Sequence, residues 1–432
     1  MRRTIKIASL AGAGMLMLTA CSGGGGSGGG GEEADLEGRG DITIWYSNNE
    51  AEIAWGKQMV EAWNAENPDE QVKAQEIPAG ESSEIVIGAA ITAGNAPCLI
   101  FNTSPAAVPQ FQKAGGLVSL SSFEDGDDYI AARSGDNAAQ YASEDGEFYQ
   151  MPWKSNPVMI FYNKAMFTEA GLDPEAPALS TYDEFLDTSR ALTEAGVAPY
   201  AIYPAPDSQF FQSWFDFYPL YGAETGGTLL VEDGKATFDS EAGATVSEFW
   251  ATLYEEGLAG QEAYTGDSFV DGNSAMTIAG PWAIDYFADD VDWGTVPVPT
   301  SKGTPAEETY TFSDAKNVGL FTACESKGTA WDVLKFATGE EQDGQLLELT
   351  GQMPLRQDLT GAYPDYFEAN PAYGVFGDQA NRVVEVPNVA NSIEVWQAFR
   401  DGYSKAVIFG EGDIPTFLKD TAAEVDALVG QD

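Results

Sequence analysis

The residues S-A-M-T-I-A-G-P-W-A-I-D, from Ser274 to Asp285, read as a strand that ends in a tight corner. Small residues at 275, 277 and 279 alternate with larger apolar residues at 276 and 278, as in a strand buried on both faces. Gly280 and Pro281 end this strand and leave Trp282 at its carboxyl end, where a helix could begin. Open α/β sheets place their ligand crevice at that end of the strands. Trp282 is therefore a candidate ligand-binding ring, although an ordinary core aromatic residue would give the same pattern.

The chain begins with the pattern of a bacterial secretion signal. A basic start precedes an apolar run over residues 7–18, which is too short to span a bilayer. The L-T-A-C that ends at Cys21 is similar to a bacterial lipobox, whose Cys is lipidated and becomes the mature N-terminus. We expect a lipoprotein signal peptide over residues 1–21 and lipidation of Cys21; a plain signal peptide with a chance Cys is the alternative.

A Gly/Ser-rich stretch over residues 22–40 follows and predicts a flexible tether. No later segment approaches the ~20 apolar residues that a membrane-spanning helix needs. We therefore expect a protein that is held to the extracellular face of the cell membrane by its lipid alone.

The composition excludes several classes of function. The chain has 68 acidic and 21 basic residues and a net charge of −47, and nucleic acid is not an expected partner because phosphate binding needs a basic patch. The acidity fits a role in solubility or a salty or acidic habitat. The roughly 400 residues that follow the signal and tether are long for a single hydrophobic core and favour two lobes.

The chain has no histidine and three cysteines, which excludes Ser-His-Asp catalysis, Cys-His catalysis and the usual zinc sites. No phosphate-binding or dinucleotide-binding motif occurs in a suitable setting. We expect no catalytic residue, no metal and no cofactor. Cys98 and Cys324 could form a disulfide outside the cytoplasm, but the sequence does not decide this.

Three short segments with strand patterns, 41–46, 71–77 and 98–101, alternate with two helical segments. This order predicts a parallel sheet with right-handed crossovers. Polar turns follow the first and third strands, and both would face the crevice at the carboxyl ends. Later, residues 209–218 are too aromatic for a solvated loop and predict either a core helix or one face of a ligand groove.

With these features the chain resembles the extracellular solute-binding proteins of ABC sugar importers, in the group related to maltose-binding protein. The match extends over nearly the whole chain after the tether, and A-M-x-I-x-G-P-W is its most specific element. The segments that carry it are the lipobox and tether, I-W at 44–45, I-F-Y-N-K at 160–164, A-M-T-I-A-G-P-W at 275–282, P-L at 354–355, V-P-N at 386–388 and Trp396.

The resemblance implies an α/β fold of the periplasmic-binding-protein type, with two lobes that are each a mostly parallel sheet flanked by helices. Two or three hinge segments would join the lobes, and the ligand would bind between them. The implied boundaries are 41–153 with 312–353 for the N-terminal lobe, 158–298 with 356–432 for the C-terminal lobe, and 154–157, 299–311 and 353–356 for the hinges.

The resemblance also implies a ligand-binding set. Trp282 and Trp396 match positions where the family stacks sugar rings. The other positions that match groove-lining residues are Asn49, Glu50, Asn102, Asn156, Gln209 and Phe211.

Some of these positions depart from the maltodextrin binders of the group. Those proteins carry Asp-Lys after the first strand, where this chain has Asn-Glu at 49–50. A Trp after their third strand is replaced by Asn102, and a hinge Glu is replaced by Asn156. The resemblance therefore implies the architecture and leaves the sugar open.

The implied function is capture of a disaccharide or oligosaccharide, and its delivery to the permease of an ABC transporter, by a monomer that does no chemistry. A secreted glycan-active enzyme is an alternative, because two carboxylates suffice for glycoside cleavage. A binder of a non-sugar solute, such as a glycerol phosphate or a polyamine, is another. Phosphate recognition favours Arg or Lys, and Lys154 is the only basic residue that we place in the crevice.

Overall fold

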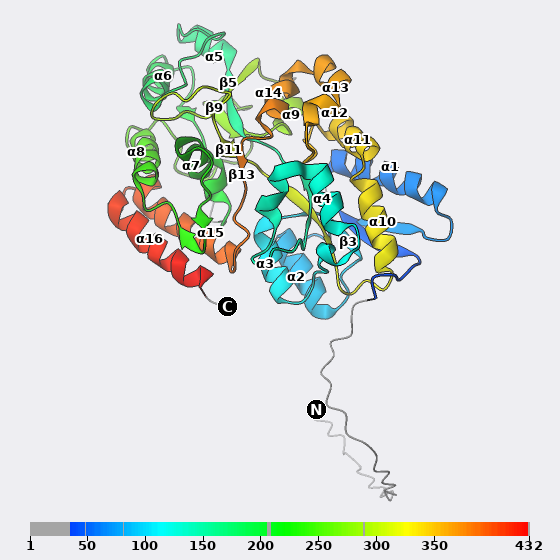
Figure 1. The fold of residues 1–432 in the computed structure, drawn as a ribbon. Coiled ribbons are helices and arrows are strands. Elements are labelled where there is room, and N and C mark those ends of the chain that lie inside the picture. The colour runs from blue at the N-terminus through cyan, green and yellow to red at the C-terminus, as the bar shows by residue number, and fades with distance from the viewer. Residues whose placement is uncertain (1–34, 48, 81, 205–208, 288–289, 431–432) are drawn as a thin grey trace, which may run out of the picture. The chain divides into compact units, whose positions relative to one another are not determined.

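The computed structural model describes residues 35–47, 49–80, 82–204, 209–287 and 290–430 (Figure 1). The predicted signal peptide, Cys21 and most of the tether lie outside the described residues. Within those ranges, every helix is too short or too polar to cross a bilayer.

The first sheet has five strands in the order β2-β1-β3-β12-β4. β1 pairs in parallel with β2 and β3, which confirms the parallel arrangement predicted from the sequence, and β12 runs antiparallel to β3 and β4. The strands are β1 (Ile42–Tyr46), β2 (Val72–Glu76), β3 (Leu99–Thr103), β4 (Met151–Lys154) and β12 (Lys316–Leu320).

Helices cover both faces of this sheet. One face packs Trp55, Phe101 and Trp153 edge to face or tilted, with ring centroids 5.1–5.6 Å apart. The other face buries Ile100 and Phe111 in a smaller cluster. The helices are α1 (Glu50–Glu66), α2 (Ser83–Ala93), α3 (Val108–Lys113), α4 (Gly126–Ser134), α10 (Lys327–Ala337) and α11 (Glu340–Thr350).

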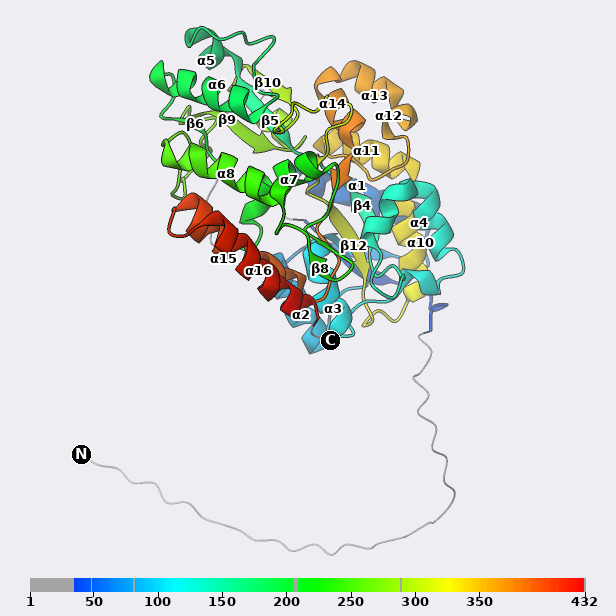
Figure 2. The same ribbon diagram turned by 60° about the vertical axis from the view of Figure 1, so that its left-hand side comes forward.

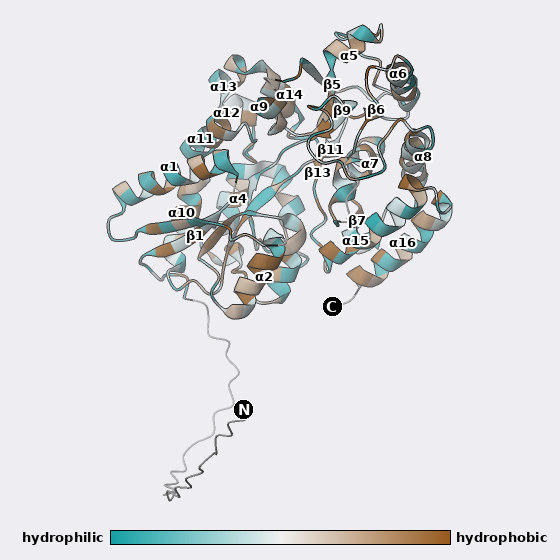
Figure 3. Cartoon of the chain, turned by 180° about the vertical axis from the view of Figure 1, so that it is seen from behind, coloured by the Kyte–Doolittle hydropathy of each residue, from teal (hydrophilic) through white to brown (hydrophobic). Residues whose placement is uncertain are grey.

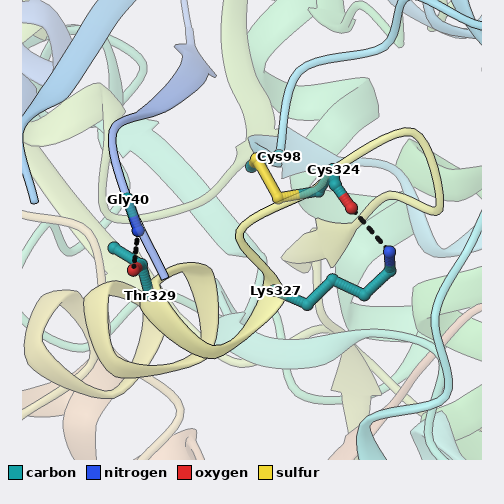
Figure 4. The surroundings of a disulfide bond; sticks show 5 residues. All are labelled: Gly40, Cys98, Cys324, Lys327 and Thr329. Carbon is teal, nitrogen blue, oxygen red and sulfur yellow. Dashed lines mark hydrogen bonds between the residues drawn. A yellow bond between two sulfur atoms is a disulfide. The ribbon is translucent and has the colours of Figure 1, made fainter. Parts of the chain in front are cut away.

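A disulfide joins Cys98 to Cys324 beside this sheet (Figure 4). Cys98 directly precedes β3, and Cys324 follows the neighbouring antiparallel strand β12. The Lys327 ammonium donates to the carbonyl of Cys324. The bond that the sequence left open is therefore formed, and it links chain segments 226 residues apart.

The second sheet has four strands in the order β10-β5-β9-β6. β5 is antiparallel to both of its neighbours, and β6 is parallel to β9, so three strands run one way and only β5 is reversed. The strands are β5 (Met159–Asn163), β6 (Tyr200–Ile202), β9 (Ser274–Ala279) and β10 (Trp293–Val296).

Helices pack on both faces of the second sheet as well. Thr181 and Glu184 have the three-residue spacing of a capping box, and this capping box begins α6. On the opposite face, Phe161 of β5 stacks on Phe376 of α14. The helices are α5 (Lys164–Glu169), α6 (Tyr182–Glu194), α7 (Phe217–Thr225), α8 (Glu241–Glu255), α9 (Ala283–Phe287), α12 (Leu359–Ala362), α13 (Pro364–Ala369), α14 (Pro371–Gln379), α15 (Ser392–Tyr403) and α16 (Ile414–Val429).

α15 and α16 follow each other at the C-terminal end and pack together against the second core (Figure 2). Both apolar and polar residues occur along α16 (Figure 3), and its buried apolar side chains are Phe417, Leu418, Ala422, Val425 and Val429. A short hairpin, β7 (Val231–Glu232) with β8 (Lys235–Ala236), lies beside α16.

The chain passes between the two sheets through segments that bond to one another. β4 leads to β5 through residues 155–158, and the backbone N–H of Ser155 donates to the carbonyl of Met353 (2.9 Å). The hydroxyls of Ser155 and Ser313 share a hydrogen bond. A parallel pair, β11 (Thr311–Phe312) with β13 (Val383–Val384), adds a further link. These bonds tie the crossing segments into one bundle, and the lobe and hinge boundaries inferred above remain our proposal.

Candidate functional site

The opening stretch folds as the sequence predicts. β9 ends at Ala279, the Gly-Pro corner follows, and α9 begins at Ala283 directly after Trp282. A Cβ added at Gly280 would lie 1.9 Å from the ring of Trp282, so the indole lies directly over the glycine. The indole is partly exposed and meets Phe215 edge to face, with centroids 6.3 Å apart. The missing side chain at position 280 thus sets where the ring lies.

A cavity of about 230 Å³ opens beside β9. Its wall consists of aromatic side chains and of polar side chains that are neutral or acidic. The lining residues are Tyr203, Pro204, Phe211, Gln212, Phe215, Tyr264, Gly266, Asp267, Ser268, Thr277 and Ile278.

The aromatic stretch 209–218 contributes both to the hydrophobic core and to the cavity wall, the two roles between which the sequence did not decide. Trp214 is buried in the second core, whereas Phe211 is 37% exposed and lines the cavity with Phe215. Gln209, which is exposed, precedes the lining residues. The stretch forms a short 3₁₀ turn and then α7, so its side chains divide between the core and the cavity.

Asp216 fixes the junction between that turn and α7. The Gln212 amide and the backbone N–H of Phe217 both donate to its buried carboxyl. Burial raises the pKa of Asp216 to about 7, and these hydrogen bonds oppose the shift. The carboxyl therefore holds Gln212 and the adjacent Phe215 in place at the cavity wall.

Polar residues gather at the carboxyl ends of β1 and β3 in the first sheet. The side-chain oxygen Oδ1 of Asn49 caps α1 by accepting from the backbone N–H groups of Ala51 (3.0 Å) and Glu52 (3.2 Å). Asn102 has a φ of 67°, a left-handed conformation that Asn tolerates better than most residues. Its Oδ1 and the hydroxyl of Ser104 are buried without a hydrogen-bond partner in the described structure. Two oxygen acceptors at this edge therefore lack a donor.

A buried ion pair lies at the same edge. The ammonium of Lys154 donates to Oε1 of Glu52 (2.6 Å), and the Gln352 amide donates to the same oxygen (2.8 Å). Burial by itself would raise the pKa of Glu52, but the charge and hydrogen bond of Lys154, with help from Gln352 and the Ser47 hydroxyl, outweigh it and lower the pKa. Glu52 is therefore ionised at neutral pH, and it neutralises the charge of Lys154.

Asn156 is fully engaged within the crossing segments. Its carbonyl accepts from the backbone N–H of Met353 (3.0 Å), and its amide donates to the Asp314 carbonyl and to Gln352 Oε1, both at 3.3 Å. The residue is also buried. We therefore remove Asn156 from the candidate ligand contacts, because its hydrogen-bonding groups hold the crossing segments together.

Comparison with known proteins identifies the family. Residues 47–344 match the family model described as bacterial extracellular solute-binding protein. The chain belongs to this family of solute-binding proteins.

Relatives of this solute-binding protein include the diacetylchitobiose binding protein DasA of Streptomyces coelicolor, which is 25% identical over 82% of each chain. The maltodextrin-binding protein MdxE of Bacillus subtilis is 23% identical over 70% of this chain and 71% of its own. Among solved structures, the cyclic alpha-maltosyl-1,6-maltose binding protein of Arthrobacter globiformis superposes with a TM-score of 0.79 at 23% identity, covering 91% of this chain and 100% of the other. The two-lobe α/β fold expected from the sequence is thereby confirmed.

In this solute-binding protein Trp396 is a core residue. It is 0% exposed, and its ring packs edge to face against Trp214 (5.7 Å) and Tyr218 (4.9 Å). With Val395 and Phe399 it lies on the buried side of α15. The expectation that Trp396 stacks on a sugar is therefore corrected, because neither face of the indole is open.

The remaining expected residues fall into two groups. Phe211 lies on the cavity and Trp282 is one ring away from it, while Asn49, Glu50 and Asn102 lie at the carboxyl edge of the first sheet. Within the described ranges, no group of three or more Cys, Asp or Glu side chains is placed to hold a metal ion.

Sequence reasoning missed several members of the solute-binding protein's candidate site. Tyr264 had no motif to mark it, whereas Phe215 and Ser104 lie in the aromatic stretch 209–218 and in the polar turn after the third strand, which the sequence indicates only as segments. Glu52 had a signal, because it lies three residues after the helix cap Asn49, at a position that turns inward on the first turn of α1.

Proposed function

We propose that this solute-binding protein is the substrate-binding component of an ABC importer and that its solute is a disaccharide or oligosaccharide captured between two lobes. One observation carries the proposal: four aromatic side chains line the cavity beside β9, and none of its described lining residues is basic. Trp282 lies next to this cavity through Phe215.

These residue types suit a sugar. A pyranose has a flat face of C–H groups, which an aromatic ring covers, and a rim of hydroxyls that need partners such as Gln212, Asp267 and Ser268. Each net hydrogen bond contributes about 1 kcal/mol and each buried Å² of apolar surface about 25 cal/mol, so several rings and amides can reach micromolar affinity, on the order of −8 kcal/mol. The cavity is smaller than the roughly 300–1,000 Å³ of a typical ligand pocket, so we assign to it one ring of the ligand.

The charge distribution favours a sugar over a phosphorylated solute. Lys154, the basic residue expected in the crevice, is buried and paired with Glu52. Lys316 beside it is paired with Asp314. A bound phosphate would have to compete with the carboxylates of Glu52 and Asp314 for the ammonium groups of Lys154 and Lys316.

The names of the relatives support an importer of sugars, since those named above bind diacetylchitobiose and maltodextrin, and a third binds arabinooligosaccharide. Binding across two lobes would let the ligand stabilise a closed form that the permease reads. Small-angle scattering that detects no compaction with a saturating sugar would count against this step.

The first test is a thermal-shift screen of the purified protein with maltotriose, diacetylchitobiose and arabinotriose. A bound sugar at 100 times its dissociation constant stabilises the fold by about 2.7 kcal/mol. Trp282→Ala should weaken the binding at least tenfold. Gly280→Ala should weaken it too, because the new methyl group displaces the ring. Tyr286→Ala is the matched control, since this exposed ring lies four residues away on α9.

If Trp282→Ala binds as tightly as the wild type, the ring is not part of the site. Release of new reducing ends from any of the three sugars would instead show an enzyme.

We also propose that the protein acts as a monomer, anchored through Cys21 after removal of residues 1–20 and tethered by 22–40. Cys21→Ser should release the exported protein into the medium. Persistence of the variant in the membrane fraction would refute the anchor, and a dimer by light scattering would refute the monomer.

A further inference from the structure

Glu52 is a buried carboxylate whose two oxygens have different surroundings. It is 5% exposed and lies on the first turn of α1. Oε1 accepts from both Lys154 and Gln352, at 2.6 and 2.8 Å. Oε2 is equally buried and accepts no hydrogen bond of normal geometry from the described residues, although the nearby Ser47 hydroxyl also helps to lower the pKa of Glu52. A buried charged acceptor with so few donors is unfavourable, so Oε2 has the capacity to accept a hydrogen bond from outside the chain.

The position of Glu52 indicates where that donor comes from. α1 begins four residues after β1 ends, and Lys154 is the last residue of β4. β1, β3 and β4 all run the same way, because β12 is antiparallel to both β3 and β4. The pair therefore lies at the carboxyl edge of the sheet, with the unpaired oxygens of Asn102 and Ser104. Open α/β sheets bind their ligands at this edge.

The other oxygen of Glu52 belongs to the crossing segments. Gln352, which donates to Oε1, also accepts from the amide of Asn156, and Asn156 bonds to the backbone of Met353 and Asp314. A short chain of hydrogen bonds therefore connects the first turn of α1 to all three segments that pass between the sheets. Two hydrogen bonds, from Gln352 to Glu52 and from Asn156 to Gln352, would therefore separate a group bound to the Glu52 carboxylate from these segments.

The chemistry at Oε2 restricts the group that it can bind. The lowered pKa of Glu52, caused by Lys154 against the opposing effect of burial, keeps the carboxylate ionised. An ionised carboxylate oxygen only accepts, so its partner must be an O–H or N–H donor, and an anion is excluded. Sugar hydroxyls are such donors.

We propose that Oε2 of Glu52 accepts a hydrogen bond from one hydroxyl of the bound sugar while Oε1 stays bonded to Lys154 and Gln352. This assignment rests on the proposed function. It makes Glu52 a specificity-determining residue and gives one carboxylate two tasks, recognition of a hydroxyl and anchorage of the crossing segments.

The test is calorimetric titration of the full chain and of Glu52→Gln with maltotriose, diacetylchitobiose and arabinotriose. Loss of a charge-assisted hydrogen bond should weaken the affinity about 10- to 100-fold. Glu61→Gln, an exposed change on the same helix, should bind as the wild type does. If Glu52→Gln alone does not fold because Lys154 is left unpaired, Glu52→Gln/Lys154→Met removes both buried charges and carries the same prediction.

Monodeoxy analogues of the tightest of the three sugars separate recognition from structure. For one analogue, wild type and Glu52→Gln should bind equally, because the hydroxyl that Glu52 recognises is already absent. If Glu52→Gln weakens every analogue by the same factor, its role is structural only. If it weakens none, Oε2 is satisfied by water. Either result overturns the inference while leaving the proposed function in place. If the wild type binds no sugar, both fall together.

Discussion

Glu385 gives a pH-dependent prediction that can be worked out from the structure. Its carboxyl is buried between crossing segments, where Oε1 accepts from the hydroxyl of Ser155 (3.3 Å), and that hydroxyl in turn bonds to Ser313. Burial raises the pKa of Glu385 from its ordinary 4.5 to about 8, and the hydrogen bonds from Tyr141, Ser313 and Ser155 oppose the shift. The folded protein therefore holds a neutral acid here at neutral pH.

The sign of the effect follows from the two states. The unfolded chain releases this proton near pH 4.5 and the folded chain near pH 8. The stability from the protonated group is complete below pH 4.5, declines as the pH rises, and is lost above pH 8. One pKa unit corresponds to about 1.4 kcal/mol, so the loss between the two pKa values is on the order of 5 kcal/mol.

Glu385→Gln replaces the acid with a neutral group of the same size. Unfolding free energies of wild type and variant should be measured by denaturant titration, followed by tryptophan fluorescence, between pH 5 and pH 9. The difference between the two proteins removes the contribution of every other carboxyl, including Asp216. As the pH rises from 5 to 9, we expect the free energy of unfolding of the variant to increase relative to that of the wild type by several kcal/mol.

An exposed acid on α15 provides the control for this experiment. Glu394→Gln should follow the wild-type curve at every pH. If the difference between wild type and Glu385→Gln stays constant from pH 5 to pH 9, Glu385 does not titrate with a raised pKa, and the account of the buried carboxyl is refuted.

Three further variants test the described packing. Cys98→Ser/Cys324→Ser should lower the free energy of unfolding by about 2–5 kcal/mol, and a reducing agent should give the wild type the same lower melting temperature; equal stability of oxidised and reduced protein would contradict the bond. Trp396→Ala should cost about 3–5 kcal/mol of stability, whereas weaker sugar binding with unchanged stability would return this ring to the site. Arg133→Met should lower the free energy of unfolding by about 3–5 kcal/mol because it leaves the buried Asp343 without its main partner. In denaturant titration, Arg133→Met/Asp343→Asn should recover part of that loss. A stability of Arg133→Met equal to that of the wild type would contradict this prediction.

The sequence predicts the parts of the fold that depend on local chemistry. The capping box at Thr181, the glycine-proline corner after β9 and the first parallel strands all occur where the pattern places them. The first two signals lie within a few residues of the element that they set, and the third follows from the order of strands and helices over residues 41–101.

Side-chain environments were harder to predict because they depend on contacts between distant segments. Trp396 shares its motif with the family, but only the packing of Trp214 and Tyr218 against it reveals that it is buried. Asn156 lies on a crossing segment as expected, yet its side-chain oxygen accepts a hydrogen bond from the backbone N–H of Met353, nearly 200 residues later. The pairing of Glu52 with Lys154, 102 residues apart, likewise has no local signal.

The central claim is that the solute is a sugar, and isothermal titration calorimetry tests it most directly. The wild-type protein should bind at least one of maltotriose, diacetylchitobiose and arabinotriose with one-to-one stoichiometry and a dissociation constant of about 1 μM or below, equivalent to roughly −8 kcal/mol. Absence of binding heat with all three sugars at millimolar concentration, at two temperatures, would contradict the claim.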